Sequence, residues 1–337
     1  MFIVNSYSLA VVFCFITMLC WGSWGNTQKL AAKSWRYELF YWDYVIGMVI
    51  FSLLLAFTAG SIGTEGRPFL QDLGQASWES IGWVLLGAVV FNVSNILLSA
   101  STSIAGMAVA FPLGVGIALV MGVLNNLLLH PVAGQNTALL WLGVALVVLA
   151  IVCNGVASGK VSGGQKDAAK NRKGIILALV AGIVMSFFSA LVYNGVDLKN
   201  FAAPAAGKVT PYTAMVIFSL GVFLSNIVVN TIVMKKPFVG EPVTYSQYFA
   251  GNFKTHLVGM LGGAIWGLGT ALNYISAGTA GAAVSYALGQ GAPMIAAIWG
   301  VFIWKEFKGA PKQVYTLLGV MFVLFVAGLT SIVMAGM

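Results

Sequence analysis

Charged residues are scarce in this chain. Asp and Glu together number 9 and Lys and Arg 17 among 337 residues, so 8% of the chain is charged while 59% is apolar. Soluble globular proteins carry about 25% charged residues, and this chain has a mean hydropathy of +0.92. The composition excludes a soluble fold, and the lack of a long polar segment excludes a separate aqueous domain. We therefore expect one integral unit in a lipid bilayer.

Sequence patterns typical of enzymes and metal sites are also missing. The chain contains no HExxH, GxSxG or P-loop pattern. Its three cysteines, Cys14, Cys20 and Cys153, lie inside apolar segments without metal-ligand spacing. We expect a protein that is not an enzyme, with no catalytic residues, no cofactor and no metal. The net charge of +8 is concentrated in particular loops, which favours a role in membrane orientation over a nucleic-acid partner.

Ten apolar windows are long enough to cross a bilayer, which takes about 20 residues in a helix. The first window, from residue 9, lacks a basic flank and a clean cleavage site, so it reads as a retained helix. We predict an all-α, polytopic fold with ten transmembrane helices. The windows fall at about 9–28, 39–59, 79–100, 104–128, 137–158, 174–193, 212–234, 256–275, 279–303 and 314–336.

A Gly- and Lys-rich segment at 158–173 divides the windows into five plus five. We predict a first five-helix repeat at 1–158, a cytoplasmic linker at 159–173 and a second repeat at 174–337. The linker and the loops on its side carry 14 of the 17 Lys and Arg residues. Since basic loops stay cytoplasmic, both termini should lie outside the cell (inner) membrane.

An internal repeat appears when the two halves are offset by 175 residues. Residues 105–116 and 280–291 agree at seven of twelve positions, including two glycines near the end of each segment. Five helices per half is an odd number, so the second copy should be inverted, as in many secondary transporters. Short connections at 101–103 and 276–278 should join the third helix to the fourth in each copy.

Polar side chains recur inside the apolar windows, and in a bilayer they must find partners. Each one alone is explained by a bond between helices, but together they favour a solute site near the midplane. Amides, hydroxyls and large aromatics predominate, without a carboxylate or lysine at the middle, so the solute should be small, neutral and polar. The candidate solute-binding residues are Trp21, Ser23, Trp24, Asn92, Asn95, Ser189, Tyr193, Trp266, Thr270, Asn273 and Gln290.

Two aromatic residues at matching repeat positions are candidate gates. Phe111 should lie about 10 Å from the inner membrane face by helical rise, and its repeat mate Tyr286 should lie similarly near the outer face. Alternating closure at these two positions would let the site face each side of the membrane in turn.

Asp43 is the foremost candidate for proton coupling, because it is a titratable group about four residues into the second window. The alternative is an interfacial carboxylate in an aromatic belt, paired with Lys29, Lys33 or Arg36. His130 and His256 are expected at the membrane edge rather than as proton shuttles.

The segment Cys-Trp-Gly-Ser-Trp-Gly-Asn-Thr at 20–27 resembles the drug/metabolite transporter superfamily, in its sugar-uptake and ureide-permease branches. Further residues that resemble the ureide-permease pattern are Asp43, Tyr44, Ala56, Phe57, Thr58, Trp78, Glu79, Ser80 and Asn95. The Trp-Gly-Ser of the first window is also similar to glucose/ribose and rhamnose carriers. The resemblance implies a ten-helix, inverted-repeat importer of a small uncharged nutrient, commonly driven by protons.

Taken together, residues and resemblance favour a secondary active transporter that imports a small neutral polar nutrient by alternating access, with protons as the coupling ion. A monosaccharide such as a pentose is the leading solute. A ureide, nucleobase or nucleoside permease of the same fold is the alternative, as is a metabolite exporter. A passive channel or a membrane-embedded enzyme is the alternative from a different functional class. The oligomeric state is left open.

Overall fold

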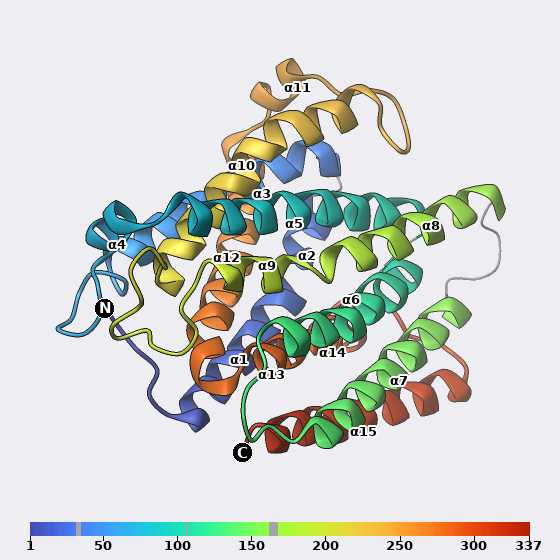
Figure 1. Cartoon of the computed structure of the whole chain (residues 1–337). Helices are drawn as coiled ribbons and strands as arrows, with labels where there is room; N and C mark the ends of the chain where they lie inside the picture. The colour runs from blue at the N-terminus through green and yellow to red at the C-terminus, as the bar shows by residue number, and fades with distance from the viewer. Residues whose placement is uncertain (32–34, 106, 162–167) are drawn as a thin grey trace.

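A computed structural model of the chain describes residues 1–31, 35–105, 107–161 and 168–337, with backbone alone at 107–109, 111, 112 and 168–171. These residues form helices and no β-strand (Figure 1). The first half comprises α1 (Tyr7–Ser23), α2 (Gly25–Ala31), α3 (Tyr37–Phe57), α4 (Phe69–Gln75), α5 (Trp78–Ala105), α6 (Met107–Leu129) and α7 (Thr137–Val161). The second half comprises α8 (Ala168–Met185), α9 (Phe188–Asn194), α10 (Pro211–Lys235), α11 (Tyr245–Phe249), α12 (Phe253–Ala280), α13 (Ala282–Gly289), α14 (Ala292–Ile298), the π-helical turn η1 (Trp299–Ile303) and α15 (Lys312–Ala335).

Each predicted window coincides with a helix or with consecutive helices. Among the described residues, nine helical segments are long and apolar enough to cross a membrane, and α6 adds the shorter apolar segment Leu113–Leu129. The all-helical, multi-pass prediction is therefore confirmed. The predicted short connections at 101–103 and 276–278 are wrong, because α5 continues to Ala105 and α12 to Ala280. The second turn lies at Gly281, whose φ of +85° suits glycine.

The bundle has two ends that the chain visits alternately. The terminal end holds both termini (Figure 1), and there the Tyr7 hydroxyl donates to the carbonyl of Val333 at 2.5 Å. At the opposite end, which we call the linker end, α7 ends and α8 begins. There Lys173 donates to the carbonyl of Phe238 at 2.7 Å, so the α10–α11 connection lies at this end too.

The helix contacts pair off when the two halves are exchanged. The contact of α1 with α12 matches that of α8 with α5, and α3 with α12 matches α10 with α5. Likewise the contact of α1 with α14 matches that of α8 with α6. Two contacts, α7 with α15 and α3 with α10, each join corresponding helices of the two halves, so exchanging the halves gives the same pair. Two copies of one five-helix unit would produce this correspondence of helix contacts. The division at 159–173 into inverted repeats stays a prediction, and helix occupies both edges of that segment, since α7 reaches Val161 and α8 starts at Ala168.

Glycines bring α3 and α12 into backbone contact. A Cβ added at Gly263 would lie 1.8 Å from the carbonyl oxygen of Tyr44, and one added at Gly47 would lie 2.0 Å from that of Met260. Small residues allow such close approach where lipid provides no hydrophobic drive between helices. The two helices therefore pack as one unit along this contact.

The first transmembrane segment breaks at Trp24, between α1 and α2, and its own polar side chains explain why. The Asn26 amide donates to the carbonyl of Ser23 at 2.9 Å, and the Thr27 hydroxyl donates to that of Trp24 at 2.6 Å. Side chains that bond neighbouring carbonyls in this way compete with the helical ladder and bend it. The break places Trp24 inside the bundle, where it is 8% exposed.

Two further segments are broken at a similar depth. Between α8 and α9 the Ser186 hydroxyl donates to the carbonyl of Ile183 at 2.7 Å, again in competition with the ladder. Between α13 and α14 the break falls at Gln290 and Gly291, and Pro293 follows in the first turn of α14. Proline has no N–H, so it fits the first turn of a helix, where that N–H would have no partner within the helix.

Candidate solute-binding site

The three helix breaks meet at one cavity. This inner cavity has a volume of about 60 Å³ and lies between both halves of the chain. Broken helices at the membrane midplane are where many transporters bind their solutes. The lining residues are Trp21, Trp24, Phe91, Asn95, Leu98, Val115, Met185, Phe188, Trp266, Gln290, Ala292 and Pro293.

Aromatic rings form one wall of the inner cavity. Trp21 and Trp266 stack with ring centroids 6.2 Å apart and an interplanar angle of 13°, and Phe91 lies 4.4 Å from Trp266. A planar solute sandwiched between two rings needs about 7 Å, twice the optimal carbon–carbon separation. The solute would therefore lie against this stack and not within it. The Trp21 indole N–H donates to the Thr270 hydroxyl at 3.1 Å, which fixes the ring.

A few polar atoms remain for a solute. The Asn95 amide nitrogen donates to the Tyr41 hydroxyl at 3.1 Å, and no hydrogen bond to its oxygen Oδ1 occurs within the described residues. The indole N–H groups of Trp24 and Trp266 likewise have no acceptor within the described part of the chain. The cavity thus offers one acceptor, two N–H donors and the amide of Gln290, without a charged side chain.

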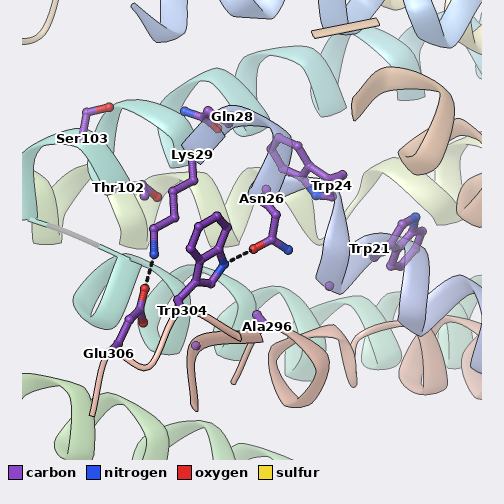
Figure 2. A pocket seen from close by; sticks show the side chains of 13 residues that line it. Trp21, Trp24, Asn26, Gln28, Lys29, Thr102, Ser103, Ala296, Trp304 and Glu306 are labelled. Atoms are coloured by element: carbon purple, nitrogen blue, oxygen red, sulfur yellow. Dashed lines mark hydrogen bonds and ion pairs between the residues drawn. The ribbon is translucent and has the colours of Figure 1, made fainter. Parts of the chain in front are cut away.

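A wider vestibule of about 310 Å³ shares Trp21 and Trp24 with the inner cavity and extends to the linker end. Figure 2 shows Trp304 between Lys29 and Asn26 at its mouth. Lys29 forms an ion pair with Glu306 and lies 4.4 Å from the centroid of the Trp304 ring. The Trp304 indole donates to Asn26 at 2.6 Å. The inner cavity therefore communicates with the linker end.

Toward the terminal end the path is filled by fully buried polar residues. The Tyr286 hydroxyl donates to the carbonyl of Ala118 at 3.1 Å, and the Tyr193 hydroxyl donates to Asn273 Oδ1 at 3.1 Å. The Asn273 amide donates to the carbonyl of Ser285 at 2.8 Å. These bonds tie α6, α9, α12 and α13 together, so the structure is closed on this side.

The structure separates the sequence candidates into groups. Five line the inner cavity, namely Trp21, Trp24, Asn95, Trp266 and Gln290. Four others hold neighbouring elements: Thr270 bonds Trp21, Ser23 accepts from the Trp299 indole at 2.9 Å, Asn92 donates to Ser225 at 2.9 Å, and Ser189 accepts from Asn126 at 3.0 Å. Tyr193 and Asn273 bond each other, and Tyr286 lies beside them in the closed region. The side chain of Phe111, the other candidate gate, lies outside the described residues.

Several lining residues have no sequence signal of their own. Phe91, Leu98, Val115, Met185 and Phe188 line the inner cavity, yet in the sequence they are indistinguishable from the apolar residues that fill a membrane bundle. Tyr41, which holds the amide of Asn95, was also missed. A tyrosine near a helix start is equally typical of an interfacial belt.

Asp43 lies apart from the inner cavity, in a buried cluster near the linker end. Its side chain is fully buried, and its oxygens accept from Tyr248 at 2.7 Å and Trp35 at 3.1 Å. His256 Nδ1 lies 2.7 Å from Asp43 Oδ1. The expected partners Lys29 and Arg36 pair instead with Glu306 and Glu38, and Lys33 lies outside the described residues.

Comparisons with known proteins agree with this architecture. The family model described as ureide permease matches residues 40–173 and 165–336. The chain is 22% identical to Ureide permease 1 of Arabidopsis thaliana, over 97% of this chain and 96% of that protein. It is 21% identical to Probable ureide permease A3 of Vigna unguiculata, over 93% and 99%.

A known crystal structure has the same fold. It superposes with a TM-score of 0.63 and 18% identity, covering 97% of this chain and 96% of that one. The family model matches segments in both halves of the chain, and its full-length relatives are permeases. The protein is therefore a transporter rather than an enzyme, and it belongs to the ureide permease family.

Proposed function

We propose that this protein imports a ureide or a related planar heterocycle, such as a nucleobase, by alternating access. The observation that carries the proposal is the inner cavity, where three broken helices bring together aromatic rings, two side-chain amides and two indole N–H groups without an acceptor among the described residues. The names of the full-length relatives support the same solute class. They favour the ureide alternative over the monosaccharide that led the predictions from the sequence.

The chemistry of the cavity supports a planar amide over a sugar. A ureide carries carbonyl and N–H groups in one plane, so its face can lie on the aromatic wall while its edge bonds indole N–H groups and Asn95 Oδ1. A pentose carries four or more hydroxyls, and the few polar groups of this cavity would leave several unpaired. Each buried unpaired polar group costs about 1–3 kcal/mol.

The remaining features of the proposal come from the sequence and its resemblance. They are membership of the drug/metabolite transporter superfamily, inverted repeats, proton-coupled symport through Asp43, and a cell (inner) membrane location with both termini outside. The concentration of basic residues on the linker side supports this orientation. In it, the vestibule opens toward the cytoplasm.

Uptake into proteoliposomes tests the solute class. We expect saturable uptake of radiolabelled allantoin, a cyclic ureide, or of uracil, a nucleobase, and no saturable uptake of xylose, a pentose. Empty liposomes are the control. Saturable uptake of xylose in place of both other solutes would return the assignment to the sugar branch, and conduction without saturation would indicate a channel.

Two asparagines on α5 give a matched test of the cavity. Asn95→Ala removes a polar group that faces the solute, so we expect KM to rise about 5- to 150-fold for a bond worth about 1–3 kcal/mol. Asn92→Ala removes the bond to Ser225 on α10, which should lower thermal stability and change KM less than Asn95→Ala does. If the two variants showed the reverse order of KM, the cavity would not be the solute site.

A further inference from the structure

Three carboxylates are fully buried among the described residues, and one of them is paired with a side chain that can exchange a proton. Glu38 pairs with Arg36 and Asp72 with Arg67. Arginine keeps its proton under all physiological conditions, so those two pairs have a fixed charge. Asp43 pairs with His256, and imidazole is the side-chain type whose ordinary proton exchange falls near neutral pH. The Asp43 cluster is therefore the buried site here whose charge can change.

The geometry assigns the proton positions. Asp43 Oδ1 lies 2.7 Å from His256 Nδ1 and accepts from the Tyr248 hydroxyl at 2.7 Å, so the ionised carboxylate holds the Nδ1–H tautomer. The other oxygen accepts from the Trp35 indole at 3.1 Å. Burial, together with the Asp43 carboxylate, raises the pKa of the Tyr248 hydroxyl, which therefore remains a donor. The atom left for an incoming proton is His256 Nε2.

The surrounding charges do not replace His256 as the partner of Asp43. Tyr248 comes from α11, His256 from α12 and Trp35 from the segment before α3. At the same end, Lys29 is paired with Glu306 and Arg36 with Glu38, and Lys254 is exposed. Among the described residues, the carboxylate of Asp43 thus has one imidazole as its source of a compensating positive charge.

We propose that Asp43 and His256 form a proton-binding site, separate from the solute cavity, that holds one proton and exchanges it with the linker end. The His256 side chain is 18% exposed, which gives it contact with that end. On binding, a hydronium ion from the linker end gives its proton to Nε2 and leaves as water while Nδ1–H stays bonded to Asp43, so a buried negative charge becomes an ion pair. The role of this site in coupling rests on the proposed proton-coupled transport. Its ability to bind a proton does not.

Two helices connect the proton site with the solute cavity. Asp43 precedes Tyr44 on α3, and the Tyr44 ring lies 5.0 Å from Trp24 and 6.3 Å from Trp266 of the cavity. His256 is about 15 Å from Trp266 along α12 by helical rise. A Cβ added at Gly259 would lie 2.4 Å from the Asp43 Cβ, so the two helices touch at the proton site itself. Loss of the proton would weaken the attraction that holds this contact.

The chemistry can be tested without any solute. The chain has two histidines, so His130→Gln leaves His256 as the single imidazole for NMR of isotope-labelled histidine. His130 suits removal because, among the described residues, its ring contacts the carbonyl of Ala190 and the ring of Tyr193 and no member of the Asp43 cluster. We expect the His256 ring to titrate, and the titration to move to lower pH on adding Asp43→Asn, because the charge that favours imidazolium is lost. An identical titration in both proteins overturns the proton site.

The coupling role is tested in proteoliposomes with radiolabelled allantoin or uracil. We expect His256→Gln and Asp43→Asn to abolish accumulation driven by a pH gradient while keeping exchange at zero gradient, whereas His130→Gln keeps both. Gln retains a donor toward Asp43, so the fold should survive, and thermal unfolding checks this. Equal loss of accumulation and exchange in stable protein would overturn the coupling role. Absence of transport by the unmodified protein would overturn the proposed function and leave the NMR result standing.

Discussion

The orientation of Trp21 depends on a single hydroxyl. Its ring forms the cavity wall with Trp266, and its N–H is used by Thr270 on the same helix as Trp266. The Thr270 hydroxyl in turn donates to the backbone carbonyl of Trp266 at 3.1 Å. Thr270 therefore links the two rings although it does not line the cavity, and Trp21 offers a solute its face but no donor.

Thr270→Val removes this link while keeping the shape of the side chain. A neutral hydrogen bond contributes about 0.5–1.5 kcal/mol, so we expect KM to rise about 2- to 10-fold with a smaller effect on kcat. The measurement is initial uptake in proteoliposomes over a range of solute concentrations.

Thr316→Val is the matched control, since that hydroxyl bonds only the carbonyl of Lys312 within the exposed face of α15. A rise in KM of the same size in both variants would show that the effect does not come from Trp21.

At the residue scale the sequence could nominate polar side chains but not sort them. An amide within an apolar helix stands out, yet Asn92 and Asn95 are three residues apart on the same face of α5. Their different roles are decided by Ser225 on α10 and by Tyr41 on α3. The partners of Asp43 on α11 and α12 lie more than 200 residues further along the chain, where sequence patterns carry no pairing information.

At the element scale, the spans were predictable because crossing a bilayer requires a fixed apolar length. The ends of the helices were harder to predict from the sequence. Ser, Thr and Gly at 101–103 and 276–278 suggest turns, but α5 and α12 continue through these residues. Inside a bundle, hydroxyls can bond carbonyls of their own helix, as Ser276 does with Leu272 at 2.7 Å. Pro293 marks the break at α13–α14 in the sequence, whereas the breaks made by side-chain bonding have no such marker.

The α3–α12 contact should tolerate no side chain at its centre. In Gly263→Ala the new Cβ would meet a backbone oxygen at 1.8 Å, so the helices must separate. We expect a loss of about 1–3 kcal/mol or more and a clearly lower thermal midpoint of the detergent-purified protein.

Gly319→Ala on α15 is the control, because nothing lies within 4 Å of its added Cβ. There, alanine should be neutral or stabilising by about 0.5–1 kcal/mol through helix propensity. Equal midpoints for the two variants would mean that the α3–α12 contact is looser than the structure has it.

At the scale of the whole molecule, the two ends differ in charge and in openness. The vestibule opens at the linker end, and buried tyrosines close the terminal end. The linker side also holds most of the basic residues. Since basic loops stay in the cytoplasm, charge predicts which compartment the open vestibule faces. A released proton from His256 would enter the same compartment as a released solute.

Labelling with a membrane-impermeant thiol reagent on intact cells tests this orientation. Ala133→Cys places an exposed thiol in the α6–α7 connection at the terminal end, and Gly159→Cys places one near the end of α7 at the linker end. Cys14 and Cys20 are buried, and Cys153→Ser removes the partly accessible native thiol. We expect label at position 133 in intact cells and at position 159 only after permeabilisation. The opposite pattern would reverse the orientation, so that the vestibule and His256 would face the outside and the structure would represent the state that captures solute rather than the one that releases it.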